Sequence, residues 1–383
     1  MISHLQYFYS ANGFLIANIR DFCEQNQTSS AAYDLNVGDI INTIQEDSFN
    51  PGSILAVVIS NSKTSSPNSQ LLRLHSTGNR ELIAGTSIHN FRVKHSFLWI
   101  SSFLQLNRTT ILIADSQMRC IRSVNTISKD VHKYSGDCSH HHNFESLKST
   151  SDLEDGPVDR ATYSQPNDLY QPSSIQRKIL VSDNDRVREI DFVRQYTKTK
   201  IVFSQKIQGL IQKGDSYLVA FVDCINIYDQ RWSFREQLLK GWIARLDLSP
   251  DFNLPTTRPH IYSDRGTGMI YRKAGIQCFN FQMVDLGADL LMLYLTVDPG
   301  CRTCYRTFAS GDARAVAVYS ITQKSLVFML YNGPIEYEDI LSIYPKTAAV
   351  SIDNNMIYFS TDDAKSGPTY CSLLKKLDVT GRL

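Results

Sequence analysis

The sequence shows no excess of charge of either sign. It has 39 Lys and Arg residues against 38 Asp and Glu residues in a chain of 383, a formal net charge of +1. Proteins that bind nucleic acids usually carry a basic excess, and proteins that bind anionic membranes carry polybasic segments. We therefore expect no nucleic-acid partner and no electrostatic attachment to a membrane surface.

Long hydrophobic runs are also missing. The longest apolar stretches, 54–59 and 290–297, have the length of β-strands, whereas a membrane-spanning helix needs about 18–20 residues. We predict no membrane span. Residues 1–19 contain no Lys or Arg and are interrupted by Asn12 and Gly13, unlike a signal peptide. An extracellular or membrane-attached location would therefore depend on segments missing from this chain, and a cytoplasmic location is the alternative.

The motifs of common catalytic sites are absent. There is no G-x-S-x-G elbow, and the glycines at 266–268 lack the strand–glycine–helix context of a phosphate-binding loop. The three consecutive histidines 140–142 would alternate sides in a strand, which favours a solvated loop over a metal site. We predict no catalytic residue, no cofactor and no metal ligand.

Helical periodicity is scarce, and short strand-like runs recur instead. They are rich in Ile, Val, Leu, Tyr and Phe and are bounded by turn-forming residues, which is typical of sandwiches, barrels and propellers. The most helix-like stretch is 232–242, where a strand is the alternative. The polar stretches 61–70 and 135–157 are predicted as loops within one all-β domain that spans residues 1–383.

An internal repeat narrows the choice among all-β folds. Residues 111–115 form an apolar strand that ends in Asp115, and a second strand with Arg122 follows a polar turn. Residues 179–183 and Arg188 repeat this pattern, and residues 217–228 carry a fainter copy that includes Asp223. Repetition at this period indicates stacked units, none of which can bury both of its faces alone.

The second copy resembles an NHL repeat, from Asp155-Gly156 through residues 161–166 to Arg188. The resemblance implies a β-propeller of six four-stranded blades, closed by pairing residues 13–19 with residues 356–360. It assigns structural roles, with the Asp residues accepting hydrogen bonds from the turns that follow and the Arg residues pairing with acidic groups or lying exposed. These residues are Asp115, Arg122, Asp155, Gly156, Pro166, Asp183 and Arg188.

The eight cysteines allow several pairings. Cys120 and Cys138 flank a predicted hairpin, and extracellular animal NHL-repeat proteins carry a similar disulfide, although two free thiols are the alternative. Cys301 and Cys304 form a C-x-x-C that is interpreted as a local pair, with a redox pair or half a zinc site as alternatives. Cys23 and Cys371 could form a clasp. Two glycosylation sequons begin at Asn26 and Asn107.

Three functions fit these features. The first is a non-catalytic, extracellular binding module that holds a protein or glycan through the loops on one face. The second resembles the propeller of peptidylglycine amidating lyase, with a channel metal held by histidines from different blades; His95, His132 and His260 are the candidates. The third is an intracellular scaffold, for which no RING or B-box cysteine–histidine array is present. The sequence does not indicate an oligomeric state.

Overall fold

The structure is a computed structural model, and every structural statement below concerns the residues that it describes. These are 8–9, 15–18, 39–60, 68–75, 79–85, 96–138, 153–172, 177–221, 224–240, 282–285, 290–297, 313–332, 344–351, 356–363 and 371–378.

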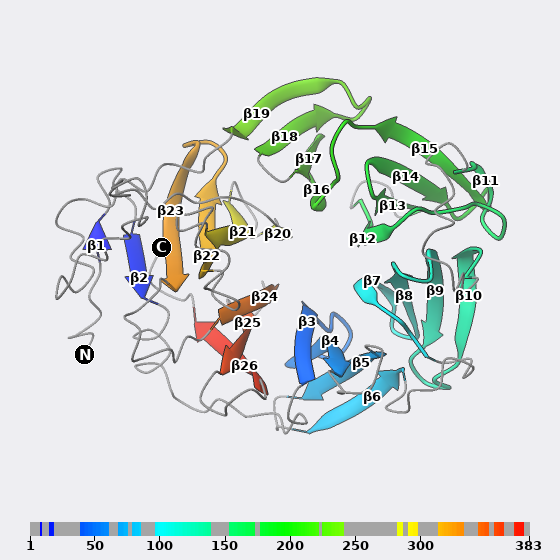
Figure 1. Ribbon diagram of the computed structural model, residues 1–383, viewed down its shortest axis with the longest axis horizontal. Helices are drawn as coiled ribbons and strands as arrows, with labels where there is room; N and C mark the ends of the chain where they lie inside the picture. Colours follow the sequence, from blue (N-terminus) through cyan, green and yellow to red (C-terminus); the bar gives the residue numbers. More distant parts are fainter. Residues whose placement is uncertain are drawn as a thin grey trace, which may run out of the picture.

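The described residues form antiparallel sheets arranged in a ring (Figure 1). Three consecutive blades follow the same order from the centre outward. The first contains β3 (Asp39–Glu46), β4 (Ser53–Ser60), β5 (Asn68–His75) and β6 (Arg80–Ala84). The second contains β7 (Ile100–Asn107), β8 (Thr110–Asp115), β9 (Cys120–Asn125) and β10 (Val131–Gly136). The third contains β12 (Pro166–Tyr170), β13 (Lys178–Asp183), β14 (Arg186–Asp191) and β15 (Tyr196–Val202), with β11 (Gly156–Pro157) on its outer edge.

Three further sheets complete the ring. The fourth blade contains β16 (Gly209–Lys213), β17 (Ser216–Ala220), β18 (Cys224–Asp229) and β19 (Phe234–Lys240). The fifth contains β20 (Gln282–Asp285), β21 (Leu290–Val297), β22 (Ala313–Ser320) and β23 (Ser325–Asn332), extended by β2 (Leu15–Asn18) and β1 (Phe8–Tyr9). A three-stranded sheet contains β24 (Tyr344–Ser351), β25 (Met356–Asp363) and β26 (Cys371–Asp378), and β24 contacts β3.

The prediction of an all-β propeller is confirmed, but the prediction of six four-stranded blades is wrong. Five blades with four or more strands are present in the described chain, and the remaining sheet has three strands. The closure also differs, because β2 pairs in parallel with β23 and not with the strand at 356–363. Strand spacing in the sequence does not show which sheet edge the N-terminal strand joins.

The structure bears on three local interpretations as well. The stretch that begins at Trp232 contains strand β19 and is not helical there. Of the predicted loop 61–70, residues 68–70 belong to β5, because the strand pairs with β4 along its whole length. Within 135–157, both ends are in strands β10 and β11.

The middle strands are apolar on both faces because neighbouring blades cover both. In β8, Ile111 and Ile113 pack against the first blade, whereas Leu112 and Ala114 pack against the third. The third blade repeats this, with Leu180 of β13 packing against the fourth blade. Each interface therefore uses alternate residues of one strand, as the period of two in a β-strand requires.

The turns between the third and fourth strands of several blades share one local design. In the second and third blades, Asn125 and Asp191 each accept hydrogen bonds from the backbone N–H groups two and three residues later. In the second and fifth blades, a Lys four residues after the start of the turn has positive φ and pairs with a Glu of the preceding blade, as Lys129–Glu81 and Lys324–Glu236. The Lys–Glu pairs of these turns link successive blades at the outer rim.

Candidate functional site

The guanidinium of Arg188 is the buried centre of a polar cluster in the third blade. Arg188 lies on β14, and its side chain has no exposed surface. It donates hydrogen bonds to the backbone carbonyls of Thr162 (2.8 Å) and Glu154 (2.9 Å). Its nitrogens lie 3.2 Å from the Asp155 carboxylate and 3.5 Å from the Asp183 carboxylate. The segment before β12 is thereby fixed to the body of the blade.

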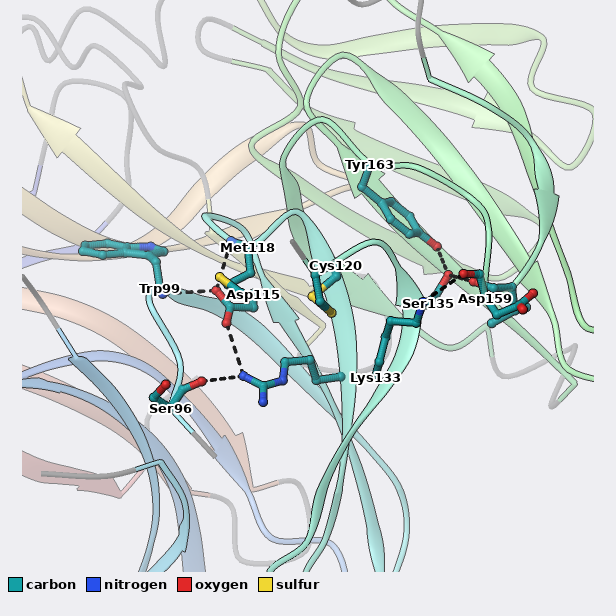
Figure 2. The surroundings of a disulfide bond; sticks show 12 residues. Ser96, Trp99, Asp115, Met118, Cys120, Lys133, Ser135, Asp159 and Tyr163 are labelled. Atoms are coloured by element: carbon teal, nitrogen blue, oxygen red, sulfur yellow. Dashed lines mark hydrogen bonds and ion pairs between the residues drawn. A yellow bond between two sulfur atoms is a disulfide. The ribbon is translucent and has the colours of Figure 1, made fainter. Parts of the chain in front are cut away.

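A related cluster lies in the second blade around Arg122 of β9 (Figure 2). Arg122 donates to the backbone carbonyl of Ser96 and lies 3.8 Å from the Asp115 carboxylate. In both clusters the Arg stacks on the aromatic residue that follows its carbonyl acceptor: Arg122 on Phe97 at 4.4 Å and Arg188 on Tyr163 at 5.2 Å. The sequence repeat thus corresponds to one repeated three-dimensional arrangement.

The Asp residues of the two clusters hold the chain that leads into their blades. Asp183 accepts hydrogen bonds from the backbone N–H groups of Ser164 (2.9 Å) and Gln165 (2.6 Å). Asp115 accepts from the N–H of Trp99 at 3.2 Å, and from that of Met118 in the following turn at 3.4 Å. The sequence predicted that each Asp accepts a hydrogen bond from the turn that follows its strand. Asp115 does so, whereas Asp183 accepts its hydrogen bonds from the segment that precedes β12.

Burial dominates the electrostatics of both Asp residues. It raises the pKa of Asp115 to about 6, although Arg122 and the backbone N–H donors oppose the shift. The pKa of Asp183 is also raised by burial, against the N–H donors of Gln165 and Ser164 and the charge of Arg188. Both carboxylates are buried and accept hydrogen bonds from backbone N–H groups, so they serve as structural groups and are not exposed to a ligand.

The sequence analysis missed a third ion pair, between Asp47 and Arg73 of the first blade. Arg73 Nε donates to the Asp47 carboxylate at 2.7 Å, and Asp47 also accepts from Gln105 of the second blade at 2.9 Å. Burial alone would raise the pKa of Asp47, but hydrogen bonds from Gln105, Arg73 and Asn50 hold it below its ordinary value. Arg73 lies on the third strand of its blade, as Arg122 does, and that position was the signal in the sequence.

A disulfide joins Cys120 and Cys138, with an S–S distance of 2.06 Å and a Cα–Cα distance of 5.0 Å. Cys120 begins β9, and Cys138 follows β10. Gly136, between them, has φ +94° and would place a Cβ only 2.9 Å from the Cα of Cys120, so only glycine fits. The bridge therefore closes the outer hairpin of the second blade.

The same hairpin is bonded to the third blade through Ser135 (Figure 2). The Ser135 hydroxyl donates to the Val158 carbonyl at 2.8 Å and lies 2.8 Å from the Tyr163 hydroxyl. Tyr163 is the residue on which Arg188 stacks. The disulfide and the buried Arg cluster therefore belong to one connected network across two blades.

The innermost strands are linked around the centre by polar side chains. Asp168 of β12 accepts a hydrogen bond from Ser102 of β7 at 3.1 Å and from the N–H of Leu210 of β16 at 3.4 Å. Ser101 of β7 donates to the Pro166 carbonyl at 2.8 Å. Burial raises the pKa of Asp168 to about 6, against these hydrogen bonds. One carboxylate thus connects three consecutive blades.

Several predicted residues take other places or lie outside the described chain. Asp155 accepts from the N–H and hydroxyl of Thr199 at 2.8 and 2.7 Å, and Gly156 starts β11. Cys371 begins β26, and Asn107 ends β7. Outside the described residues are Cys23, Asn26, His95, Asp223, His260, Cys301, Cys304 and residues 140–142.

Metal-binding and membrane-spanning features were sought in the described part of the chain. There, no three His, Cys, Asp or Glu side chains are grouped to hold a metal ion. No helix among the same residues is long and apolar enough to cross a membrane.

We predict that replacing Arg188 with Met lowers the free energy of unfolding by roughly 3–5 kcal/mol, because a buried carboxylate and two carbonyls lose their donor. Arg122→Met should cost about 1–3 kcal/mol, since that side chain bonds one carbonyl and is not fully buried. The control is Arg194→Met, whose 84% exposed side chain predicts a change within about 0.5 kcal/mol. Denaturant titration measures all three. Equal stabilities of the Arg188 and Arg194 variants would contradict the assigned role.

We also predict that Asp168 makes the fold less stable as the pH rises. Its folded-state pKa of about 6 lies above the ordinary value of 3.8, so the folded state binds more protons between these values. The contribution is fully present below the unfolded pKa and is lost as the pH rises through about 6. Between pH 4 and pH 7, the stability of the natural protein should fall relative to Asp168→Asn by on the order of 2 kcal/mol. A difference that stays constant over this range would contradict the prediction.

Solved structures that are similar to this chain include hydrazine synthase. Hydrazine synthase from Kuenenia stuttgartiensis is 12% identical, and the superposition covers 77% of this chain and 67% of that chain with a TM-score of 0.40. No family model and no curated protein matches the sequence. The propeller architecture accordingly stands on the sheets described above.

Proposed function

We propose that the chain is a single-domain, non-catalytic NHL-type propeller that works outside the cell and binds a protein or glycan partner through its loops. The observation that carries the proposal is the repeated Asp–Arg cluster in two consecutive blades, joined to the Cys120–Cys138 disulfide. The cluster is the feature on which the resemblance to NHL repeats rests. The disulfide supports an oxidising compartment, because such bonds are rare where thiols are kept reduced.

The separation of buried charged pairs from exposed loops within the blades supports binding without catalysis. The Asp115–Arg122 and Asp183–Arg188 pairs are largely buried and hold the chain in place, so the groups available to a ligand in these blades are those of the connecting loops. The turn between β8 and β9 exposes Gln117 and is fixed at both ends, by Asp115 and by Cys120. In the next blade, Asn184 of the β13–β14 turn donates to the Gln165 carbonyl and accepts from the N–H of Ile207. Loops held in this way suit recognition on a rigid scaffold.

The first test is a thiol count on the purified protein. Without reductant and under denaturing conditions, at most six of the eight cysteines should react, and peptide mapping should recover Cys120 linked to Cys138. Cys120→Ser should lower the stability by about 3 kcal/mol, as expected for a loop of this length. Cys224→Ser is the control, because this buried cysteine takes no part in the Cys120–Cys138 disulfide and its replacement leaves the bridge intact. Eight reactive thiols would contradict an extracellular location.

The second test is a binding screen of the full chain against an array of extracellular protein domains and an array of glycans. We expect saturable binding to a member of one array, weakened at least tenfold by a combined Gln117→Ala and Asp185→Ala change. The matched control changes Ser128 and Arg194, which lie in the outer turns of the same two blades. A stoichiometric zinc or calcium ion that survives dialysis would contradict the non-catalytic assignment and favour a channel metal.

A further inference from the structure

The hairpin turn between β7 and β8 presents an asparagine in the geometry of a glycosylation acceptor. Asn107 ends β7, and both Asn107 and Arg108 are exposed. The Asn107 Oδ1 accepts hydrogen bonds from the N–H of Thr109 at 2.9 Å and from its hydroxyl at 3.0 Å. Its Nδ2 finds no acceptor among the described residues. The amide nitrogen is therefore directed at no protein group, while the amide oxygen is held by the third residue of the sequon.

We propose that Asn107 carries an N-linked glycan, an inference that rests on the proposed extracellular function. In the transfer, a bond forms between Asn107 Nδ2 and C1 of the sugar. The C1–O bond to the donor's lipid-linked diphosphate breaks, the diphosphate departs as the leaving group, and Nδ2 loses one proton to the surrounding base or solvent. The Thr109 hydroxyl, bonded to Oδ1, polarises the amide that reacts. An exposed Asn-x-Thr turn accommodates such a bulky group without repacking the core.

A neighbouring asparagine provides a contrast within the same blade. Asn125 is also exposed at the end of a strand, and its Oδ1 accepts from the N–H groups of Ile127 and Ser128. The third residue of its turn is Ile127, so no hydroxyl reaches the amide and no sequon exists. Asn125 therefore tests whether exposure in a turn is sufficient for an asparagine to be glycosylated.

A glycan on Asn107 gives the two edges of the second blade different functions, because one edge is shielded and the other is left for the partner. The N–H of Thr126 donates to the Thr109 carbonyl and the Thr126 hydroxyl to the Arg108 carbonyl, both at 2.9 Å, so the Asn107 turn adjoins the outer turn. That outer turn presents Ile127, 75% exposed. A glycan on Asn107 shields this apolar side chain. The partner is then left with the opposite edge, where the turns 116–119 and 184–185 lie at the other ends of the strands.

The experiment expresses the full chain behind an added secretory leader in cultured animal cells and measures intact mass before and after enzymatic removal of N-glycans. Asn107→Gln and Thr109→Ala should each remove one glycan, whereas Thr109→Ser and Asn125→Gln should leave its number unchanged. Asn107→Gln should also increase the binding of a hydrophobic dye, and Asn107→Gln with Ile127→Ser should reverse this increase.

The two proposals fail in distinguishable ways. A secreted natural chain with the Cys120–Cys138 disulfide formed but with Asn107 unmodified would overturn the glycan inference and leave the proposed function standing. Eight reactive thiols in protein from its native source would overturn the extracellular function, whatever the modification of Asn107 in the directed expression. If removal of the glycan strengthened partner binding at the Ile127 edge, the assignment of the two edges would be overturned.

Discussion

The buried pairing of an arginine with carboxylates and backbone carbonyls is the interaction on which the second and third blades depend. A guanidinium placed inside a β-sheet stack must find its hydrogen-bond partners within the protein, since water is excluded. Arg188 donates to two backbone carbonyls and lies beside the carboxylates of Asp155 and Asp183, whereas its Nε has no hydrogen-bond partner among the described residues. The carbonyls belong to the chain that enters the blade, so the charge determines where that chain runs. Removing the charge would therefore affect the path of the backbone as well as the energy of one contact.

Apolar packing between neighbouring blades also constrains the structure. The middle strands β8 and β13 are buried on both faces, and alternate side chains of each strand belong to different clusters. No blade could bury these residues alone, which makes the ring and not the blade the unit of stability. Polar links such as Asp168 and ion pairs such as Lys129–Glu81 then fix the register between blades, at the centre and at the rim.

In the hairpins, the side chains that stabilise the fold lie apart from those that are accessible to a ligand. Within the described blades, Asp115, Asp183 and Arg188 of the sequence repeat are buried, whereas the turns carry exposed groups such as Gln117 and Ile127. The two edges of the second blade differ in turn chemistry: one carries the Asn107 sequon and the exposed Ile127, and the other carries the turn fixed by Asp115 and the disulfide. The proposed glycan and the proposed partner would therefore occupy different edges.

Much of this was determined by the sequence alone. The all-β class and the repeat that contains Asp115, Arg122, Asp183 and Arg188 followed from local strand patterns and from their recurrence along the chain, and the resemblance to NHL repeats implied the propeller. Other features depended on residues far apart in sequence. The pair of Asp47 with Arg73, the bridge from Asp168 to two other blades, the union of β2 with β23 and the three-stranded last sheet were decided by the tertiary structure. The physical reason is that local pattern specifies which residues form strands and which side chains face inward, whereas the partner of a buried charge or a free sheet edge is chosen only when distant segments are brought together.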